Sequence, residues 1–169
     1  MDDGRTQGTI ITSASEATHA TGQALGHLLG PGDVLLLTGD LGAGKTQLAK
    51  GIAAGLQVEG PITSPTFGII RVHEGASTLY HVDLYRLERA DELEDTGYFE
   101  VLEAGGVAVV EWGDRFPEAI PPEHLAIRIE IVDEAKRALA FQAHGARYAR
   151  LASSWLAACD ALAGVEVRR

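Results

Sequence analysis

Residues 34–46 read VLLLTGDLGAGKT, an apolar run that leads into a glycine-rich loop ending in Lys45 and Thr46. The last eight residues match the P-loop pattern Gly-x4-Gly-Lys-Thr, also called Walker A, at every constrained position. The apolar run predicts a buried parallel strand, and KTQLAKGIAAGL predicts a helix with Leu48 and Ile52 on one face. This stretch therefore predicts a phosphate-binding turn between a strand and a helix.

Each residue type of the loop has a task in phosphate binding. Glycines permit positive φ and let backbone N–H groups converge on phosphate oxygens, while the helix adds the positive end of its dipole. Lys45 is expected to reach the β- and γ-phosphates as a point charge, and Thr46 to place its hydroxyl on Mg²⁺. The nucleotide-binding residues expected in the loop are Gly39, Asp40, Leu41, Gly42, Ala43, Gly44, Lys45 and Thr46.

Phosphoryl transfer also needs a carboxylate for the metal and a group that orients the nucleophile. Asp83 follows the strand-like run LYHV, and Glu111 follows VAVV. Acids at the ends of parallel strands tend to project into the crevice where ligands bind. The hydroxyl-rich segment SPTF contains Thr66 and suits a role in sensing the γ-phosphate. The expected catalytic residues are thus Lys45, Asp83, Glu111 and Thr66.

The order of the predicted elements indicates a single domain over residues 1–169 with a three-layer α/β architecture. The fold expected is that of a P-loop NTPase, with a mixed, mostly parallel central sheet flanked by helices. Besides the strand and helix at the loop, the patterns predict strands at 8–12, 68–73, 78–82 and 107–112, an antiparallel pair at 125–132 and 137–144, helices from Ser15 to the break at 30–32, over 88–104 and over about 149–162, and a frayed basic tail.

Composition narrows the class of protein. Fourteen Lys and Arg against 24 Asp and Glu give a net charge of −10, so we expect no DNA binding and a hold on RNA only through a basic partner. No apolar run approaches the roughly 20 residues of a membrane span, and the N-terminus does not read as a signal peptide, which predicts a cytoplasmic protein. The lone Cys159 is expected to be a buried small hydrophobe.

Four spaced motifs together resemble the bacterial TsaE family, the small ATPases of tRNA threonylcarbamoyladenosine biosynthesis. They are GDLGAGKT at 39–46, SPTF at 64–67, HVDLYR at 81–86 and VEW at 110–112. The resemblance implies a P-loop fold with a mixed sheet, ATP and Mg²⁺ as ligands, and weak intrinsic ATPase activity. It also implies partnership with the TsaD–TsaB complex, which modifies adenosine 37 of tRNA. ATP hydrolysis by this protein would drive or reset that complex. Contact with tRNA would be indirect.

The resemblance also carries residue roles over to this sequence. It places Thr46 and Glu111 on the metal, Glu111 directly or through water. It makes Asp83 the candidate for positioning water or metal, and Thr66 the sensor of the γ-phosphate. Ser15, at the start of the first helix, falls where the family approaches the adenine.

Other positions correspond less directly to the family pattern. The resemblance places Trp112 by the site or the partner surface, and Arg137 matches a family arginine near the nucleotide. Gln47 stands where a second threonine often follows the lysine. The helix expected from about residue 149 has no counterpart in the comparison, so it receives no role.

Two other functions remain open on the residues alone. A small-molecule kinase could use the same loop, but it would need an arginine-rich lid, and the arginines after the loop are dispersed at 71, 86, 89 and 115. A nucleotide-dependent binding module, in which hydrolysis is incidental, would keep the loop without needing turnover. The histidines lack the spacing of a zinc site, and no Ser-His-Asp order supports acyl transfer.

Overall fold

The computed structural model describes residues 6–62 and 69–169, in which eight strands form one sheet flanked by helices. In chain order the elements are β1 (Gln7–Thr12), α1 (Ser15–Gly26), β2 (Val34–Thr38), α2 (Lys45–Gly55), β3 (Ile70–His73), β4 (Leu79–Asp83), α3 (Glu92–Thr96), α4 (Tyr98–Glu103), β5 (Val107–Glu111), the 3-10 helix η1 (Pro117–Ala119), β6 (His124–Ile131), β7 (Arg137–His144), α5 (Ala146–Cys159) and β8 (Val165–Arg168).

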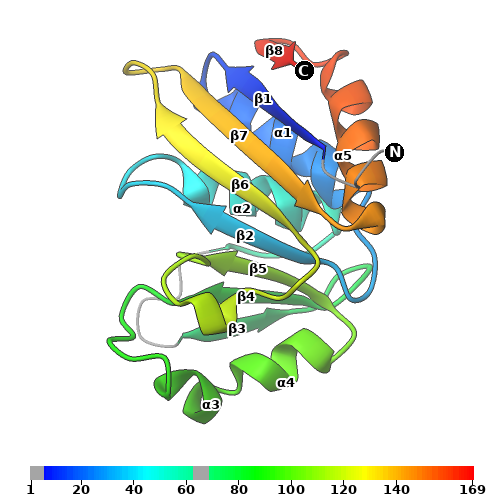
Figure 1. Cartoon of the computed structure of the whole chain (residues 1–169). Coiled ribbons are helices and arrows are strands. Elements are labelled where there is room, and N and C mark those ends of the chain that lie inside the picture. Colours follow the sequence, from blue (N-terminus) through cyan, green and yellow to red (C-terminus); the bar gives the residue numbers. More distant parts are fainter. Residues whose placement is uncertain (1–5, 63–68) are drawn as a thin grey trace.

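The strands lie in the order β3-β4-β5-β2-β6-β7-β1-β8 (Figure 1). Pairing is parallel between β4 and β5, between β5 and β2, and between β2 and β6, and it is antiparallel in the other four described pairings. The mixed α/β sheet is therefore confirmed, but the expectation that it is mostly parallel was wrong, because antiparallel strands extend it on both sides. The parallel part is the centre that carries the P-loop strand. The predicted antiparallel pair is confirmed as β6 and β7, joined at Asp133, whose Oδ1 accepts hydrogen bonds from the backbone N–H groups of Ala135 and Lys136.

Strand β2 is buried on both faces, which explains its continuous apolar run. Leu35 and Leu37 belong to the larger core, under α1, α2 and α5, whereas Val34 and Leu36 belong to the smaller core under α3 and α4. Val34 is 6% exposed and the three leucines no more than 3%. Figure 1 shows the resulting layers, with α1, α2 and α5 on one face of the sheet. The three-layer arrangement expected from the sequence is confirmed.

Helices α1 and α2 touch backbone to backbone through glycines. A Cβ added at Gly51 of α2 would lie 2.2 Å from the carbonyl oxygen of His19, and one added at Gly22 of α1 would lie 2.5 Å from that of Leu48. Both distances are far below any van der Waals contact, so only glycine permits this approach. The close packing holds α2, and with it the end of the P-loop, against α1.

The acidic segment at 88–104 is not the single helix expected. It forms two short helices, α3 and α4, separated by Gly97 with φ +85°. A residue in the left-handed region ends an α-helix, and glycine adopts that region without steric cost. The break turns Tyr98 into the smaller core, where its hydroxyl donates to the carbonyl oxygen of Ala119 over 2.6 Å.

The C-terminal tail is also different from the prediction. Residues 165–168 form strand β8, which extends the sheet by pairing antiparallel with β1, so the expectation of a frayed tail was wrong. The preceding helix α5 begins at Ala146, earlier than expected, and buries Trp155 and Cys159 completely. Cys159 is thus the buried hydrophobe predicted, and burial raises the pKa of its thiol to about 12. Among the described helices, none is long and apolar enough to cross a membrane.

Candidate nucleotide site

The P-loop lies where β2 ends and α2 begins, as the sequence predicts. Gly44 precedes the first helical residue with φ +111°, and Gly39 leaves the strand with φ +141°. A Cβ at Gly39 would lie 2.5 Å from the carbonyl oxygen of Ile129 on β6, so the neighbouring strand also requires glycine there. These two positions explain why the loop is glycine-rich: one sets the turn into the helix and the other the approach to the sheet.

The ammonium group of Lys45 is held at the centre of the loop. Its Nζ donates to the carbonyl oxygens of Gly39 at 2.5 Å and Asp40 at 2.9 Å, and the residue is 6% exposed. Burial lowers the pKa of Lys45, while the nearby carboxylates of Glu111 and Asp83 act in the opposite direction. The nearby acidic groups therefore offset part of the effect of burial on the pKa of this lysine.

Asp83 and Glu111 lie side by side at the carboxyl ends of β4 and β5. The parallel register pairs these two residues directly, and it also pairs Glu111 with Leu37 on β2. Burial raises the pKa of Asp83 and the Glu111 carboxylate adds to this, while a hydrogen bond from the backbone N–H of Tyr85 opposes it. The sheet thus brings both predicted carboxylates next to the P-loop strand.

One pocket of about 460 Å³ collects most of these groups. Its lining residues come from the P-loop, the first turns of α2 and the ends of β4 and β5: Leu41, Gly42, Gly44, Lys45, Thr46, Gln47, Lys50, Asp83, Glu111 and Trp112. Its side-chain oxygens include the hydroxyl of Thr46 and the carboxylates of Asp83 and Glu111, groups whose chemistry fits Mg²⁺. Thr66, the expected γ-phosphate sensor, lies outside the described residues.

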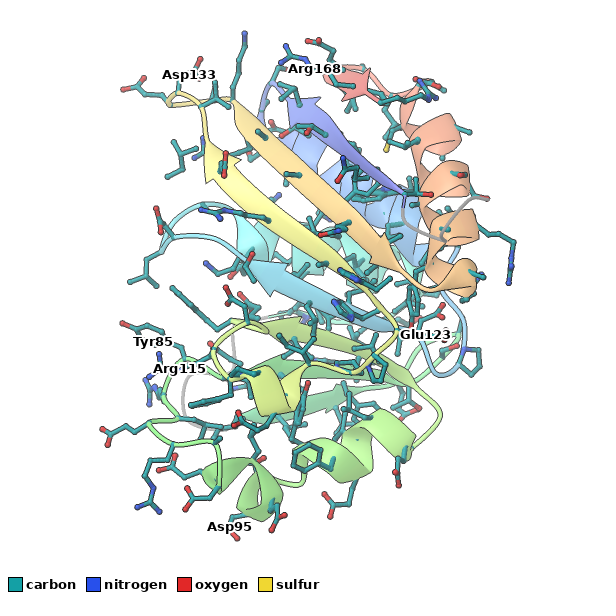
Figure 2. All side chains as sticks on the ribbon, in the orientation of Figure 1. Tyr85, Asp95, Arg115, Glu123, Asp133 and Arg168 are labelled. Carbon is teal, nitrogen blue, oxygen red and sulfur yellow. The ribbon has the colours of Figure 1, made fainter. Side chains whose placement is uncertain are left out.

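Trp112 forms one wall of this pocket. It follows β5 with φ +57°, a region that costs a non-glycine residue on the order of 1–3 kcal/mol. Lys45 Nζ lies 4.6 Å from the centroid of the Trp112 ring. The centroid of the Tyr85 ring lies 4.9 Å from that of the Trp112 ring. Tyr85 stands on the loop after β4, at the edge of the sheet where the P-loop lies (Figure 2). The strained backbone therefore holds the indole over the P-loop lysine.

A second pocket, of about 320 Å³, lies on the other side of Gly44 and Gln47. Ser15 and Arg137 both line it, although they come from α1 and β7. Arg137 Nε donates to the carbonyl oxygen of Ala43 over 3.0 Å, which ties β7 to the P-loop. The two residues that the sequence associated with the rest of the nucleotide thus meet beside the loop.

The residue that sequence reasoning missed is His81. Its Nε2 lies 2.5 Å from Oε2 of Glu111, and the two residues are 1% and 4% exposed. The available signal was the two-residue period of β4, which puts His81 on the same face as Asp83. The sequence patterns place this histidine in the HVDLYR motif and give it no role of its own.

The comparisons with known proteins agree with one another. The family model described as threonylcarbamoyl adenosine biosynthesis protein TsaE matches residues 12–139. A Bacillus subtilis relative named tRNA threonylcarbamoyladenosine biosynthesis protein TsaE is 44% identical over 137 residues, covering 80% of this chain and 85% of the relative. The Treponema pallidum protein of the same name is 38% identical over 127 residues, covering 75% and 94%.

A solved structure is also similar to this chain. The crystal structure of Bacillus subtilis YdiB matches with a TM-score of 0.73 and 37% sequence identity, covering 89% of this chain and 95% of that one. The matched family segment contains the P-loop, both strand-end carboxylates and the β6–β7 hairpin up to residue 139. This chain therefore belongs to the TsaE family of threonylcarbamoyl adenosine biosynthesis proteins.

Proposed function

We propose that this protein is a Mg²⁺-dependent ATPase with weak intrinsic activity that serves the threonylcarbamoyladenosine modification of tRNA at adenosine 37. The observation that carries the proposal is the convergence of Lys45, Asp83 and Glu111 on one pocket. The names of the relatives support the pathway, because they are called tRNA threonylcarbamoyladenosine biosynthesis proteins. Their names do not mention hydrolysis, so that part rests on the site.

The proposed roles follow from the position of each group. Lys45 exchanges its two carbonyl acceptors for β- and γ-phosphate oxygens, and Trp112 holds it in place. Thr46 and Glu111 hold Mg²⁺, which supplies neutralisation of the charge that develops on the phosphates. Asp83 orients the attacking water, since its raised pKa and its position beside Glu111 suit contact with a water proton. Thr66 stays the proposed γ-phosphate sensor.

The second pocket is the proposed site of the adenosine moiety. It adjoins the P-loop at Gly44 and Gln47, so a nucleotide whose phosphates occupy the loop can extend into it. Ser15 lines the pocket at the first turn of α1, and Arg137 forms its other wall. The proposed nucleotide contacts therefore run from Ser15 through Gly39, Asp40, Leu41, Gly42, Ala43, Gly44, Lys45 and Thr46.

The proposed partners are the TsaD–TsaB complex, with tRNA contacted only through it. The net charge of −10 supports this division, because an acidic chain repels a phosphate backbone. The TsaD–TsaB complex would then carry out the tRNA modification, and ATP hydrolysis by this protein would drive or reset that complex. Because tRNA modification is the proposed setting, the proposal includes a cytoplasmic location.

The kinase alternative has less support. Within the part of the chain that the structure describes, the phosphate pocket is lined by two cationic side chains, Lys45 and Lys50, and by no arginine. A phosphoryl-transfer lid depends on arginines that close over the transferred group. The binding-module alternative keeps the same pocket and differs only in whether turnover matters.

The proposal is tested by measuring ATP hydrolysis and partner binding with the purified chain. Lys45→Ala is expected to reduce turnover about 100-fold or more, since it removes a charge aimed at the transferred phosphate. The matched control is Arg150→Ala, an exposed cation on α5, which is expected to leave turnover unchanged. Binding to TsaD–TsaB should require ATP in the wild type and be lost with Lys45→Ala. Full binding by that variant without ATP would contradict the proposal.

Two further measurements separate the alternatives. Depletion of the protein, followed by mass spectrometry of tRNA nucleosides, should lower threonylcarbamoyladenosine; an unchanged level would refute the pathway assignment. Asp83→Asn and Glu111→Gln should abolish both turnover and modification. If they bind ATP, lose turnover and still support modification in cells, the protein is a binding module. Stoichiometric ADP release with a phosphorylated metabolite would instead identify a kinase.

A further inference from the structure

The Glu111 carboxylate is held from inside the protein by one side chain. His81 Nε2 lies 2.5 Å from its Oε2, and His81 and Glu111 are 1% and 4% exposed. As a carboxylate, Glu111 can only accept a hydrogen bond, so this contact requires the tautomer of His81 that carries its proton on Nε2. In a buried setting such a charge-assisted bond is short and strongly oriented. The bond therefore restricts Glu111 to one side-chain arrangement.

The strand register explains why the two side chains meet. On β4, His81 stands opposite Val109 of β5, two residues before the pair formed by Asp83 and Glu111. Residues two apart on a strand share a face, so Glu111 has His81 as a diagonal neighbour and Asp83 as its direct neighbour. Asp83 has a separate donor, the backbone N–H of Tyr85. The two adjacent carboxylates thus have different supports.

Packing alone does not account for a histidine at this position. A buried apolar residue would fill the same volume at no polar cost, whereas His81 Nδ1 is buried without a hydrogen-bond partner among the described residues. Nδ1 of the ring thus lacks a hydrogen bond, whereas Nε2 contacts Glu111. The contact with the carboxylate is therefore what the residue provides.

We propose that His81 is a positioning residue for the phosphate pocket: it holds Oε2 of Glu111 so that Oε1 is directed to the ion or water bound beside the P-loop. This inference rests on the proposed ATPase function, because it concerns the same carboxylate. Residues that orient a metal-binding side chain in this way typically contribute about 10–100-fold to metal affinity or activity.

The test compares variants that keep or remove the donor. His81→Gln carries a side-chain N–H that can reach the position of Nε2, whereas His81→Leu fills the space without a donor. His124→Gln is the matched control, because His124 is a buried histidine bonded to the carbonyl oxygen of Pro121 at the start of β6. Calorimetry measures ADP binding with and without Mg²⁺, and steady-state assays give kcat and KM for ATP.

His81→Leu is expected to weaken the Mg²⁺-dependent tightening of ADP binding by about 10–100-fold and to lower kcat over the same range. ADP binding without Mg²⁺ should stay near wild type, because the P-loop is intact. His81→Gln should recover most of the loss, and His124→Gln should resemble the wild type. If the leucine variant does not fold, His81→Asn replaces it, since its amide is one methylene too short to reach Glu111.

Two results would overturn the inference. One is a wild-type Mg²⁺ dependence in His81→Leu or His81→Asn. The other is a glutamine variant as defective as leucine, with metal-free ADP binding and thermal stability lowered in parallel, which would indicate a packing role. A wild-type protein that binds Mg²⁺-ADP but hydrolyses no ATP would refute the proposed function alone, and the calorimetric comparison would still decide the role of His81.

Discussion

Replacing Tyr148 by Phe should weaken the anchor between helix α5 and the P-loop strand. The backbone N–H of Val34, the first residue of β2, donates to the Tyr148 hydroxyl over 2.9 Å, and the two residues are 6% and 4% exposed. Phenylalanine keeps the ring but leaves that N–H without its acceptor. A buried donor that loses its partner costs about 1–3 kcal/mol of stability.

The surroundings of this hydrogen bond narrow the expected loss of stability. Val34 and Tyr148 both line an open pocket of about 750 Å³ between β2, α4 and α5, so water can reach the freed N–H and satisfy it in part. We therefore expect the lower half of the range, about 1–2 kcal/mol. For a chain of this size, about 2–4 °C per kcal/mol converts this into a fall in Tm of roughly 2–8 °C.

The assay is urea unfolding followed by circular dichroism, together with a thermal melt. Tyr80→Phe is the matched control, because the Tyr80 hydroxyl makes no hydrogen bond to any residue that the structure describes, and its loss should stay within about 0.5 kcal/mol. Nucleotide binding should not change, since Val34 begins the strand and the P-loop follows its other end. Equal stability of Tyr148→Phe and Tyr80→Phe would refute the reasoning.

Three further predictions follow from contacts and burial elsewhere. Gly51→Ala should destabilise the protein by about 1–3 kcal/mol in urea unfolding, because its Cβ would lie 2.2 Å from the His19 carbonyl oxygen. The control Gly30→Ala, whose new Cβ has no atom within 4 Å, should be neutral or stabilising by up to about 1 kcal/mol. Equal losses of stability in the two variants would contradict the packing argument. Burial raises the pKa of Asp83 above its unfolded value, so the folded state binds more protons and becomes less stable as pH rises from about 4 through the folded pKa. Asp83→Asn lacks this loss, so its Tm relative to that of the wild type should be higher at pH 7 than at pH 4. A Tm difference that does not change with pH would argue against a raised pKa. Cys159 is buried, and burial raises the pKa of its thiol to about 12. A thiol reagent at pH 8 should therefore label it only when the protein unfolds. Rapid labelling of the native protein would contradict this and show that the thiol is accessible.

Local patterns were sufficient for much of the candidate site. The P-loop is a contiguous segment, and its apolar strand and following helix are marked by periodicities that need no distant partner. Asp83 and Glu111 could be named because each directly ends an apolar run. Their actual proximity depends on β4 pairing with β5 in a register that puts one opposite the other, which no local pattern contains.

The errors lie where tertiary context or a single glycine overrides a pattern. The acidic segment has enough helix-forming residues to predict one helix, yet Gly97 in the left-handed region ends α3 and lets Tyr98 turn into the core. The tail VEVR has only four residues of alternation, too few to predict a strand alone. It becomes β8 because β1 offers it an edge to pair with.

The sequence by itself determined where the candidate phosphate site lies, because a P-loop is made from consecutive residues and its flanking elements carry their own periodicities. The tertiary structure alone decided which distant side chains lie beside that site. His81 reaches Glu111 through the register of two strands, and Tyr148 reaches Val34 across 114 residues of chain. Such contacts depend on strand order and helix packing, which arise from burying the whole apolar surface at once and leave no mark in any short stretch.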